Sequence, residues 1–229
     1  MSGPNGPTRR RSFNTTADAQ LARCPIYTCD VLQKSTKRGR PRLFDEDAAI
    51  DAAVDLFWER GYRNSTTREL ETALGMHQPS IYNAFGSKKG LLLQAIDRYE
   101  RRVEAELLSL LDGDDGYGAV EAFFRELGDW IAQNRHRGCL VVNLMMGEAD
   151  DDAVDERVRT YRSMIFDALH TAVSRSEPNV ALATDRANVL LAAVLGLHLT
   201  ARTAAATGEV PAMVIGLCHQ IDEWRKAAT

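Results

Sequence analysis

The sequence has few of the features that mark a membrane protein or a secreted protein. It holds no uninterrupted apolar run of about 18 residues, so no transmembrane span and no membrane partner are expected. Its first residues include arginines but no apolar segment after them, so they do not resemble a secretory signal. The protein is therefore expected to be cytoplasmic.

The sequence also lacks the common signatures of catalysis and metal binding. Its five histidines are dispersed, without an HExxH motif, a nucleophile elbow or a P-loop. The four cysteines, Cys24, Cys29, Cys139 and Cys218, form no CxxC pair and are expected to be free thiols. The acidic loop 112–118 has its glycine one place too early for a calcium loop and no glutamate at the twelfth position. We expect no enzyme activity, no metal and no cofactor.

What the sequence does contain is a marked charge asymmetry. Residues 1–44 carry nine basic and two acidic residues, a net charge of +7. Residues 45–111 carry −4 and residues 112–229 carry −7. A basic arm on an acidic body suits a protein whose N-terminal end meets a polyanion. A solvated tail on an acidic globule fits the same charges. Residues 1–42 also lack periodicity, so a disordered arm is predicted there.

Helical periodicity fills the chain after this arm, and no strand pattern of matching strength occurs. Asp45, Glu46 and Asp47 suit the start of the first helix. Thr66 and Glu69 fit a capping box at the start of the second. These patterns predict an all-α fold. The expected helices are 45–60, 66–75, 78–84, 87–111, 119–134, 137–148, about 150–174, about 181–206 and 211–227.

The segment 65–89 has the layout of a helix-turn-helix, in which two short helical patterns are separated by a turn bearing Gly75. The second helix carries polar residues on its outer face, which are candidates for contacts with DNA bases: His77, Gln78, Ser80 and Asn83. Polar or basic residues at the neighbouring helix starts are candidates for phosphate contacts: Ser65, Thr66, Thr67, Ser87 and Lys88. A small helical corner with a polar outer face is the alternative.

A set of residues in this region occurs in order at fixed spacing: Gly61-Tyr62, Ser65 to Thr67, Leu74-Gly75, Ser80-Ile81-Tyr82, Phe85 and Gly86-Ser87-Lys88. With these residues, the region resembles the DNA-binding domain of the TetR family of transcriptional regulators. The resemblance implies a basic arm at 1–42, a three-helix DNA-binding domain at 43–90, and a larger helical ligand-binding and dimerisation domain at 91–229.

The resemblance also implies a function and partners. It implies a homodimeric repressor that binds a palindromic operator in double-stranded DNA and is released by a small-molecule inducer. By position, Tyr82 joins the phosphate contacts. The last two helices, about 181–206 and 211–227, would form the dimer interface. The first of them is rich in Ala, Leu and Val, which suits close helix packing, although a central helix of one subunit would look the same.

The basic arm contains the run Arg38, Arg40 and Arg42, which we expect to dock in the minor groove beside the recognition helix. An architectural DNA-binding protein that uses this arm is an alternative function, which the acidic body disfavours.

Residues of the regulatory half include candidates for a ligand pocket. These are Phe123, Phe124, Trp130, Met145, Met146, Tyr161, Met164 and Phe166. Plain core packing is the alternative for each. Cys139 follows Arg135, His136 and Arg137, whose charges favour a thiolate. A regulator that senses oxidants or electrophiles through Cys139 is therefore an alternative, as is a buried structural cysteine. The identity of the ligand does not follow from the sequence.

Overall fold

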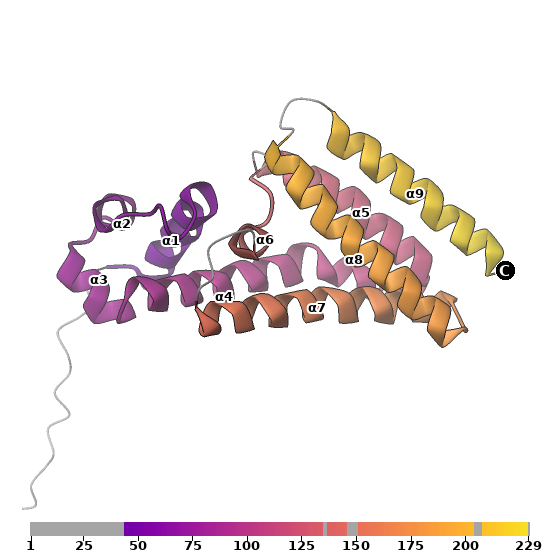
Figure 1. The fold of residues 1–229 in the computed structure, drawn as a ribbon, viewed down its shortest axis with the longest axis horizontal. Coiled ribbons are helices and arrows are strands. Elements are labelled where there is room, and N and C mark those ends of the chain that lie inside the picture. The colour runs from indigo at the N-terminus through magenta and orange to yellow at the C-terminus, as the bar shows by residue number, and fades with distance from the viewer. Residues whose placement is uncertain (1–43, 135–136, 146–150, 204–207, 229) are drawn as a thin grey trace, which may run out of the picture. The chain divides into compact units, whose positions relative to one another are not determined.

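A computed structural model describes residues 44–134, 137–145, 151–203 and 208–228, and every regular element in these ranges is a helix (Figure 1). The all-α class is thus confirmed. The residues that the structure describes form one compact unit. The boundary expected at residue 90 falls inside the helix α4, Lys88–Glu106, which runs on without a break. The basic arm and Met146 lie outside the described ranges.

The N-terminal part is built from three helices, α1 (Glu46–Arg60), α2 (Thr67–Leu74) and α3 (Gln78–Phe85). Asp45 caps α1, because its Oδ1 accepts a hydrogen bond from the Ala48 amide at 3.2 Å. Gly61 ends α1 at a φ of 79°, a conformation that favours glycine. These three helices follow the sequence-based expectation closely, and side-chain caps mark the starts of α1 and α2.

The fourth expected helix is shorter than predicted. A single helix was expected over 87–111, whereas α4 ends at Glu106 and the 3₁₀ helix η1 covers Leu108–Asp112. The apolar periodicity continues through the break, because Leu107, Leu108 and Leu111 are all buried. A periodic pattern of buried residues does not distinguish an α-helix from a 3₁₀ turn over so short a stretch.

The remaining helices form the larger part of the unit. They are α5 (Gly116–Gln133), α6 (Leu140–Met145), α7 (Asp152–Ser176), α8 (Val180–Thr203) and α9 (Glu209–Ala227). Helix α5 begins three residues before the expected start at 119. The first turn of α5 packs closely on α7, because a Cβ on Gly116 would lie 2.1 Å from the Ala172 carbonyl oxygen.

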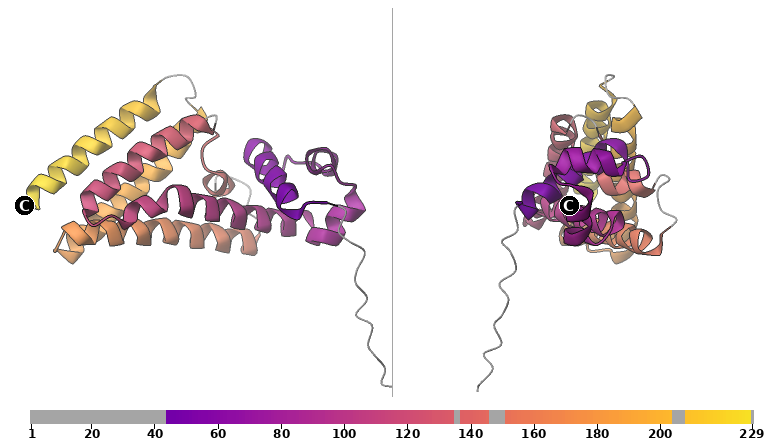
Figure 2. Two further views of the ribbon diagram at one scale, coloured as in Figure 1. Left: turned by 180° about the vertical axis from the view of Figure 1, so that it is seen from behind. Right: turned by 90° about the vertical axis from the view of Figure 1, so that its left-hand side faces the viewer.

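Helix α4 connects the N-terminal helices to this larger part. It packs against both α1 and α7, and Figure 2 shows α4 and α7 running side by side. Arg157 of α7 bonds to Asp97 and Glu100 of α4, the latter at 2.7 Å. Helix α7 in turn packs on α8, and α5 packs on α9.

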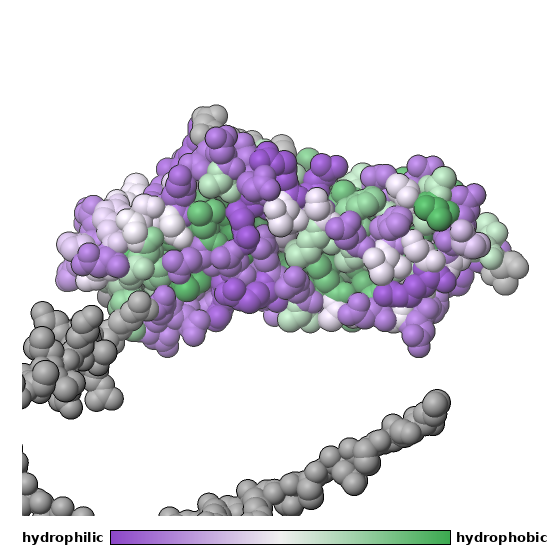
Figure 3. Space-filling model, turned by 90° about the horizontal axis from the view of Figure 1, so that it is seen from below, coloured by the Kyte–Doolittle hydropathy of each residue, from purple (hydrophilic) through white to green (hydrophobic). Residues whose placement is uncertain are grey.

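Helix α8 is a long, mostly apolar helix. Val180–Thr203 is long and apolar enough to cross a membrane by length and composition, although 39% of its apolar window is buried inside the protein. It packs between α7 and α9. Its outward face keeps large apolar side chains, among them Val189 at 51% and Leu199 at 44% exposure. The surface seen in Figure 3 likewise alternates between polar stretches and apolar patches.

A buried ionic cluster joins α5, the end of α7, α8 and α9. Arg186 of α8 bonds to the Glu177 carboxylate and to the Tyr117 hydroxyl. The guanidinium also lies over the rings of Tyr117, at 5.5 Å, and Trp224, at 5.4 Å. Arg186 and Glu177 are only 7% and 6% exposed, so neither charge can be hydrated if the other is removed.

Candidate nucleic-acid interface

The helix-turn-helix begins with a complete capping box at α2. The Glu69 amide donates to Thr66 Oγ1 at 3.3 Å, and the Thr66 amide donates to Glu69 Oε2 at 2.8 Å. The Thr66 hydroxyl also donates to Glu69 Oε2 at 2.9 Å, and the hydrogen bonds from the Thr66 amide and hydroxyl to this carboxylate lower the pKa of Glu69. At the other end of α2, Gly75 adopts a left-handed conformation with a φ of 63°. The capping box predicted from the sequence is confirmed, and it sets the start of the motif.

Helix α3 separates its apolar and polar side chains onto two faces. Ile81 and Phe85 are buried, at 1% and 5% exposure, and Phe85 also contacts the ring of Phe44 at 6.2 Å between centroids. The four residues predicted to contact bases are all exposed: His77, Gln78, Ser80 and Asn83. Their side chains offer hydrogen-bond donors and acceptors of the kind that read base edges. Contact with bases stays a prediction.

The residues predicted to contact phosphate differ in how accessible they are. Thr66 and Ser87 are exposed, and Thr67, Tyr82 and Lys88 are half-buried. Ser87 caps α4, since its Oγ accepts from the Gly90 amide at 2.9 Å. The Lys88 ammonium lies 4.6 Å from the centre of the Tyr62 ring, which belongs to the connection between α1 and α2.

Ser65 is an exception among these residues. It is 1% exposed, and its hydroxyl donates to the Gly61 carbonyl oxygen at 2.7 Å. Its side chain is thus used inside the protein and does not face a phosphate. The inward orientation of Ser65 could not be predicted from the sequence, because a serine before a capping threonine suits an internal hydrogen bond and a phosphate contact equally well.

The segment 137–139, just before α6, connects the N-terminal helices to the larger helical part of the unit. Trp58 Nε1 of α1 donates to the Gly138 carbonyl oxygen at 3.1 Å. Arg137 stacks over the Trp58 ring at 4.2 Å and bonds to Asp55 at 3.0 Å. A Cβ on Gly138, whose φ is 71°, would lie 2.8 Å from the His198 carbonyl oxygen. This segment therefore lies between α1 and α8, and sequence reasoning did not identify it.

Cys139 lies in the buried junction at the end of this segment. It is fully buried, with Sγ 3.5 Å from the Tyr161 hydroxyl, and burial raises the pKa of its thiol. His198 is also buried, which lowers the pKa of its imidazole to about 4 and keeps it neutral at pH 7. Because reactive cysteines are accessible and have lowered pKa values, this geometry argues against a sensor role for Cys139.

Most of the residues predicted to line a ligand pocket belong to the core. Phe123, Phe124, Trp130 and Tyr161 are at most 7% exposed. The rings of Phe123 and Phe124 contact each other at 5.2 Å, and Trp130 stacks on Trp58 at 5.3 Å. Met164 is half-buried against the core, and Met145 is 39% exposed. These four aromatic side chains thus pack in the core, and their contact with a ligand stays a prediction.

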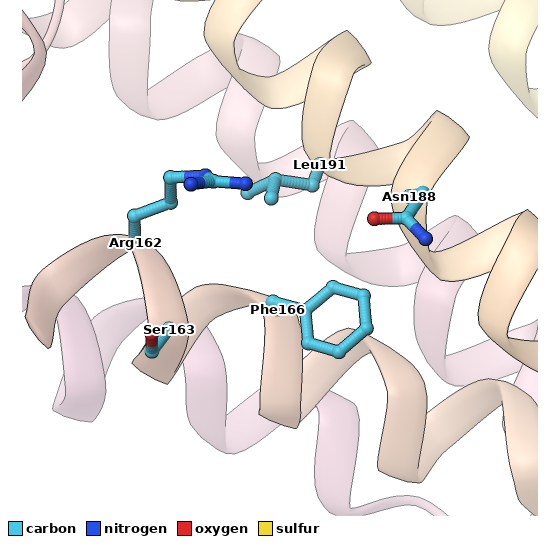
Figure 4. A pocket seen from close by; sticks show the side chains of 5 residues that line it. All are labelled: Arg162, Ser163, Phe166, Asn188 and Leu191. Carbon is cyan, nitrogen blue, oxygen red and sulfur yellow. The ribbon is translucent and has the colours of Figure 1, made fainter. Parts of the chain in front are cut away.

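Phe166 differs, because it lines a cavity between α7 and α8. The cavity has a volume of about 190 Å³ and is lined by Arg162, Ser163, Phe166, Asn188 and Leu191 (Figure 4). The Phe166 ring stacks on His170 at 5.7 Å. Within the part of the chain that the structure describes, no group of three or more His, Cys, Asp or Glu side chains is placed to hold a metal.

Comparison with known proteins links this geometry to a family. Residues 49–95 match the model of the bacterial regulatory proteins of the tetR family. The HTH-type transcriptional repressor ComR of Escherichia coli K12 is 33% identical over 109 residues, which are 46% of this chain and 52% of ComR. The repressor BdcR of the same organism is 32% identical over 133 residues, or 57% of this chain and 67% of BdcR. The matches thus span about half to two thirds of these relatives.

A solved structure extends the likeness to the larger helical part. CifR, a TetR family transcriptional regulator solved as a cysteine mutant with 26-base-pair operator DNA, has a TM-score of 0.70 and 26% identity. The match covers 79% of this chain and 98% of that one. With the helix-turn-helix geometry described above, these similarities show that the chain belongs to the TetR family of bacterial transcriptional regulators.

Proposed function

We propose that this protein is a cytoplasmic repressor that binds a palindromic operator as a homodimer and is released by a small molecule. The observation that carries the proposal is the polar, exposed face of α3, held against the core by Ile81 and Phe85. Thr66 and Lys88 lie on the helices to either side, where phosphate contacts set the orientation of a recognition helix. ComR and BdcR are named as repressors, and CifR was solved on operator DNA.

The function is tested by selecting bound fragments from the DNA of the source organism with the purified protein, followed by footprinting. A protected palindrome with half-sites about 34 Å apart supports a dimeric operator-binding regulator. Uniform coating of DNA contradicts it and supports an architectural protein. The arm residues Arg38, Arg40 and Arg42 are proposed to add minor-groove contacts at such a site.

The proposed dimer rests on an apolar face formed by α8 and α9. Val189 and Leu199 of α8 are 51% and 44% exposed, and Ile215 of α9 is 56% exposed. On α9 the exposed positions include the small residues Ala212 and Gly216. Small side chains let helices approach closely, and large apolar side chains gain free energy when an interface removes them from water.

We expect the double variant Val189→Glu, Leu199→Glu to be monomeric, because two carboxylates cannot be buried in an apolar interface without partners. Analytical ultracentrifugation at micromolar concentration measures the mass. Met145→Glu is the matched control, since Met145 is a similarly exposed apolar residue outside α8 and α9. A dimer that survives the double substitution contradicts this interface.

The cavity between α7 and α8 is the proposed site of the regulatory ligand. Its volume of about 190 Å³ is smaller than the ~300–1,000 Å³ of most drug-sized sites, which favours a small molecule. Phe166 and Leu191 supply apolar walls, while Arg162 and Asn188 supply a positive charge and an amide (Figure 4). This combination suits a small organic anion with a flat apolar body.

Benzoate is a suitable probe of this site, measured by isothermal titration calorimetry. Arg162→Gln is expected to weaken benzoate binding about tenfold or more, the effect of losing one charged hydrogen bond. Arg159→Gln is the control, because Arg159 lies on the same helix and pairs with Glu156 at 2.7 Å. Equal binding by the Arg162 variant, or no saturable binding by the wild type, contradicts a site for such an anion.

A further inference from the structure

The first turn of α3 is held by a side chain of α2. The Gln78 amide, the first of α3, donates to Glu71 Oε1 at 2.6 Å. His77, in the N-cap position of α3, makes no capping hydrogen bond with its own side chain. The carboxylate of Glu71 therefore satisfies one of the amides at the N-terminus of α3 that have no partner within the helix.

The backbone of Glu71 holds the turn that precedes α3. Its carbonyl oxygen accepts hydrogen bonds from the amides of Gly75 and Met76, the latter at 3.2 Å. The same residue thus bonds to the end of α2, to the turn, and to the start of α3. Hydrogen bonds to both the backbone and the side chain of Glu71 therefore determine where α3 begins relative to α2.

The other amides at the start of α3 are also accounted for. Pro79 has no amide hydrogen, and the amides of Ser80 and Ile81 donate to the His77 carbonyl oxygen at 2.8 and 3.2 Å. A helix N-terminus with free amides attracts phosphate. Here a carboxylate occupies that position, so its negative charge repels a phosphate from this end of the helix.

We propose that Glu71 is a positioning and specificity-determining residue for operator recognition. It holds the first turn of α3 so that Gln78 and Ser80 meet base edges. Its negative charge also prevents the N-terminus of α3 from binding a DNA phosphate independently of sequence. Affinity for phosphate at this point would add to binding on every duplex equally and lower the preference for the operator. The inference rests on the proposed function of operator binding.

The positioning role is tested in the protein without DNA by hydrogen exchange of the Gln78 amide, followed by NMR. Glu71→Ala is expected to speed this exchange roughly fivefold, as for a lost helix cap. Glu71→Gln keeps an acceptor oxygen and is expected to restore protection. Glu59→Ala, which removes an exposed charge of α1, is expected to leave the exchange unchanged. Wild-type exchange in Glu71→Ala, or failure of Glu71→Gln to restore protection, overturns the positioning role.

The specificity role is tested by measuring the affinities for the operator and for random duplex DNA at one salt concentration. Glu71→Ala is expected to weaken operator binding about fivefold without weakening binding to random DNA, so the ratio of the two falls. Glu59→Ala is expected to leave the ratio at the wild-type value. A wild-type ratio in Glu71→Ala overturns the specificity role. If the wild type itself prefers no duplex, the proposed function fails, and the exchange experiment still decides the positioning role.

Discussion

Replacing Gln78 and Asn83 together by alanine is expected to weaken operator binding by about 100-fold or more. Each well-placed side chain that reads a base edge contributes about 1–3 kcal/mol of discrimination. Both side chains are exposed on α3, so the fold should survive their loss. The hydrogen bond from the Gln78 amide to Glu71 is made by the backbone and stays in place.

Fluorescence anisotropy on the operator and on a scrambled duplex of equal length measures this effect. We expect the affinity to fall for the operator and not for the scrambled duplex, because base contacts add no affinity on a sequence that they do not match. Gln133→Ala, an exposed substitution at the end of α5, is the control and should leave both affinities unchanged. An equal loss on both duplexes would falsify base reading and assign the two side chains to the DNA backbone.

The second large effect is expected from the substitution Arg186→Leu. It leaves Glu177 buried without its charged partner and should lower the free energy of unfolding by about 3–5 kcal/mol. The guanidinium also contacts the rings of Tyr117 and Trp224, so its loss loosens α9 as well as α8. Urea unfolding followed by circular dichroism measures the change.

The double variant Arg186→Leu, Glu177→Leu separates the charge effect from the loss of packing. Removing both charges is expected to recover most of the lost stability, because buried ion pairs are often no more stabilising than apolar residues of similar volume. Arg159→Leu breaks an exposed pair with Glu156 and should cost less than about 1 kcal/mol. If the Arg186 variant is no less stable than this control, the buried cluster does not hold α8 and α9 together.

Much of the DNA-binding part could be predicted from its sequence because its determinants are local. The capping box joins Thr66 and Glu69, three residues apart, and Gly75 marks the end of α2. The apolar positions Ile81 and Phe85 lie four residues apart on α3 and turn the polar residues outward. Interactions over so few residues are visible in any short window of the sequence.

The roles of several side chains could not be predicted because they depend on partners far away in the chain. Trp130 and Tyr161 were candidates for a pocket, and the structure uses them in a core that Trp58 completes from α1. The chain from 87 to 111 was expected to be one helix, since burial continues past the point where α4 ends at Glu106. Periodicity reports which residues are buried, but not what they are buried against.

The all-α class, the helix-turn-helix and the outward face of α3 could be read from the sequence alone, since caps and periodicity act within a few residues. The contact of Glu71 with Gln78 across the turn, and the attachment of α1 by Arg137 and Gly138, became visible only in the folded chain. The physical reason is that a hydrogen bond or an ion pair is set by distance in space. Arg137 and Asp55 lie 82 residues apart in the chain and 3.0 Å apart in the fold.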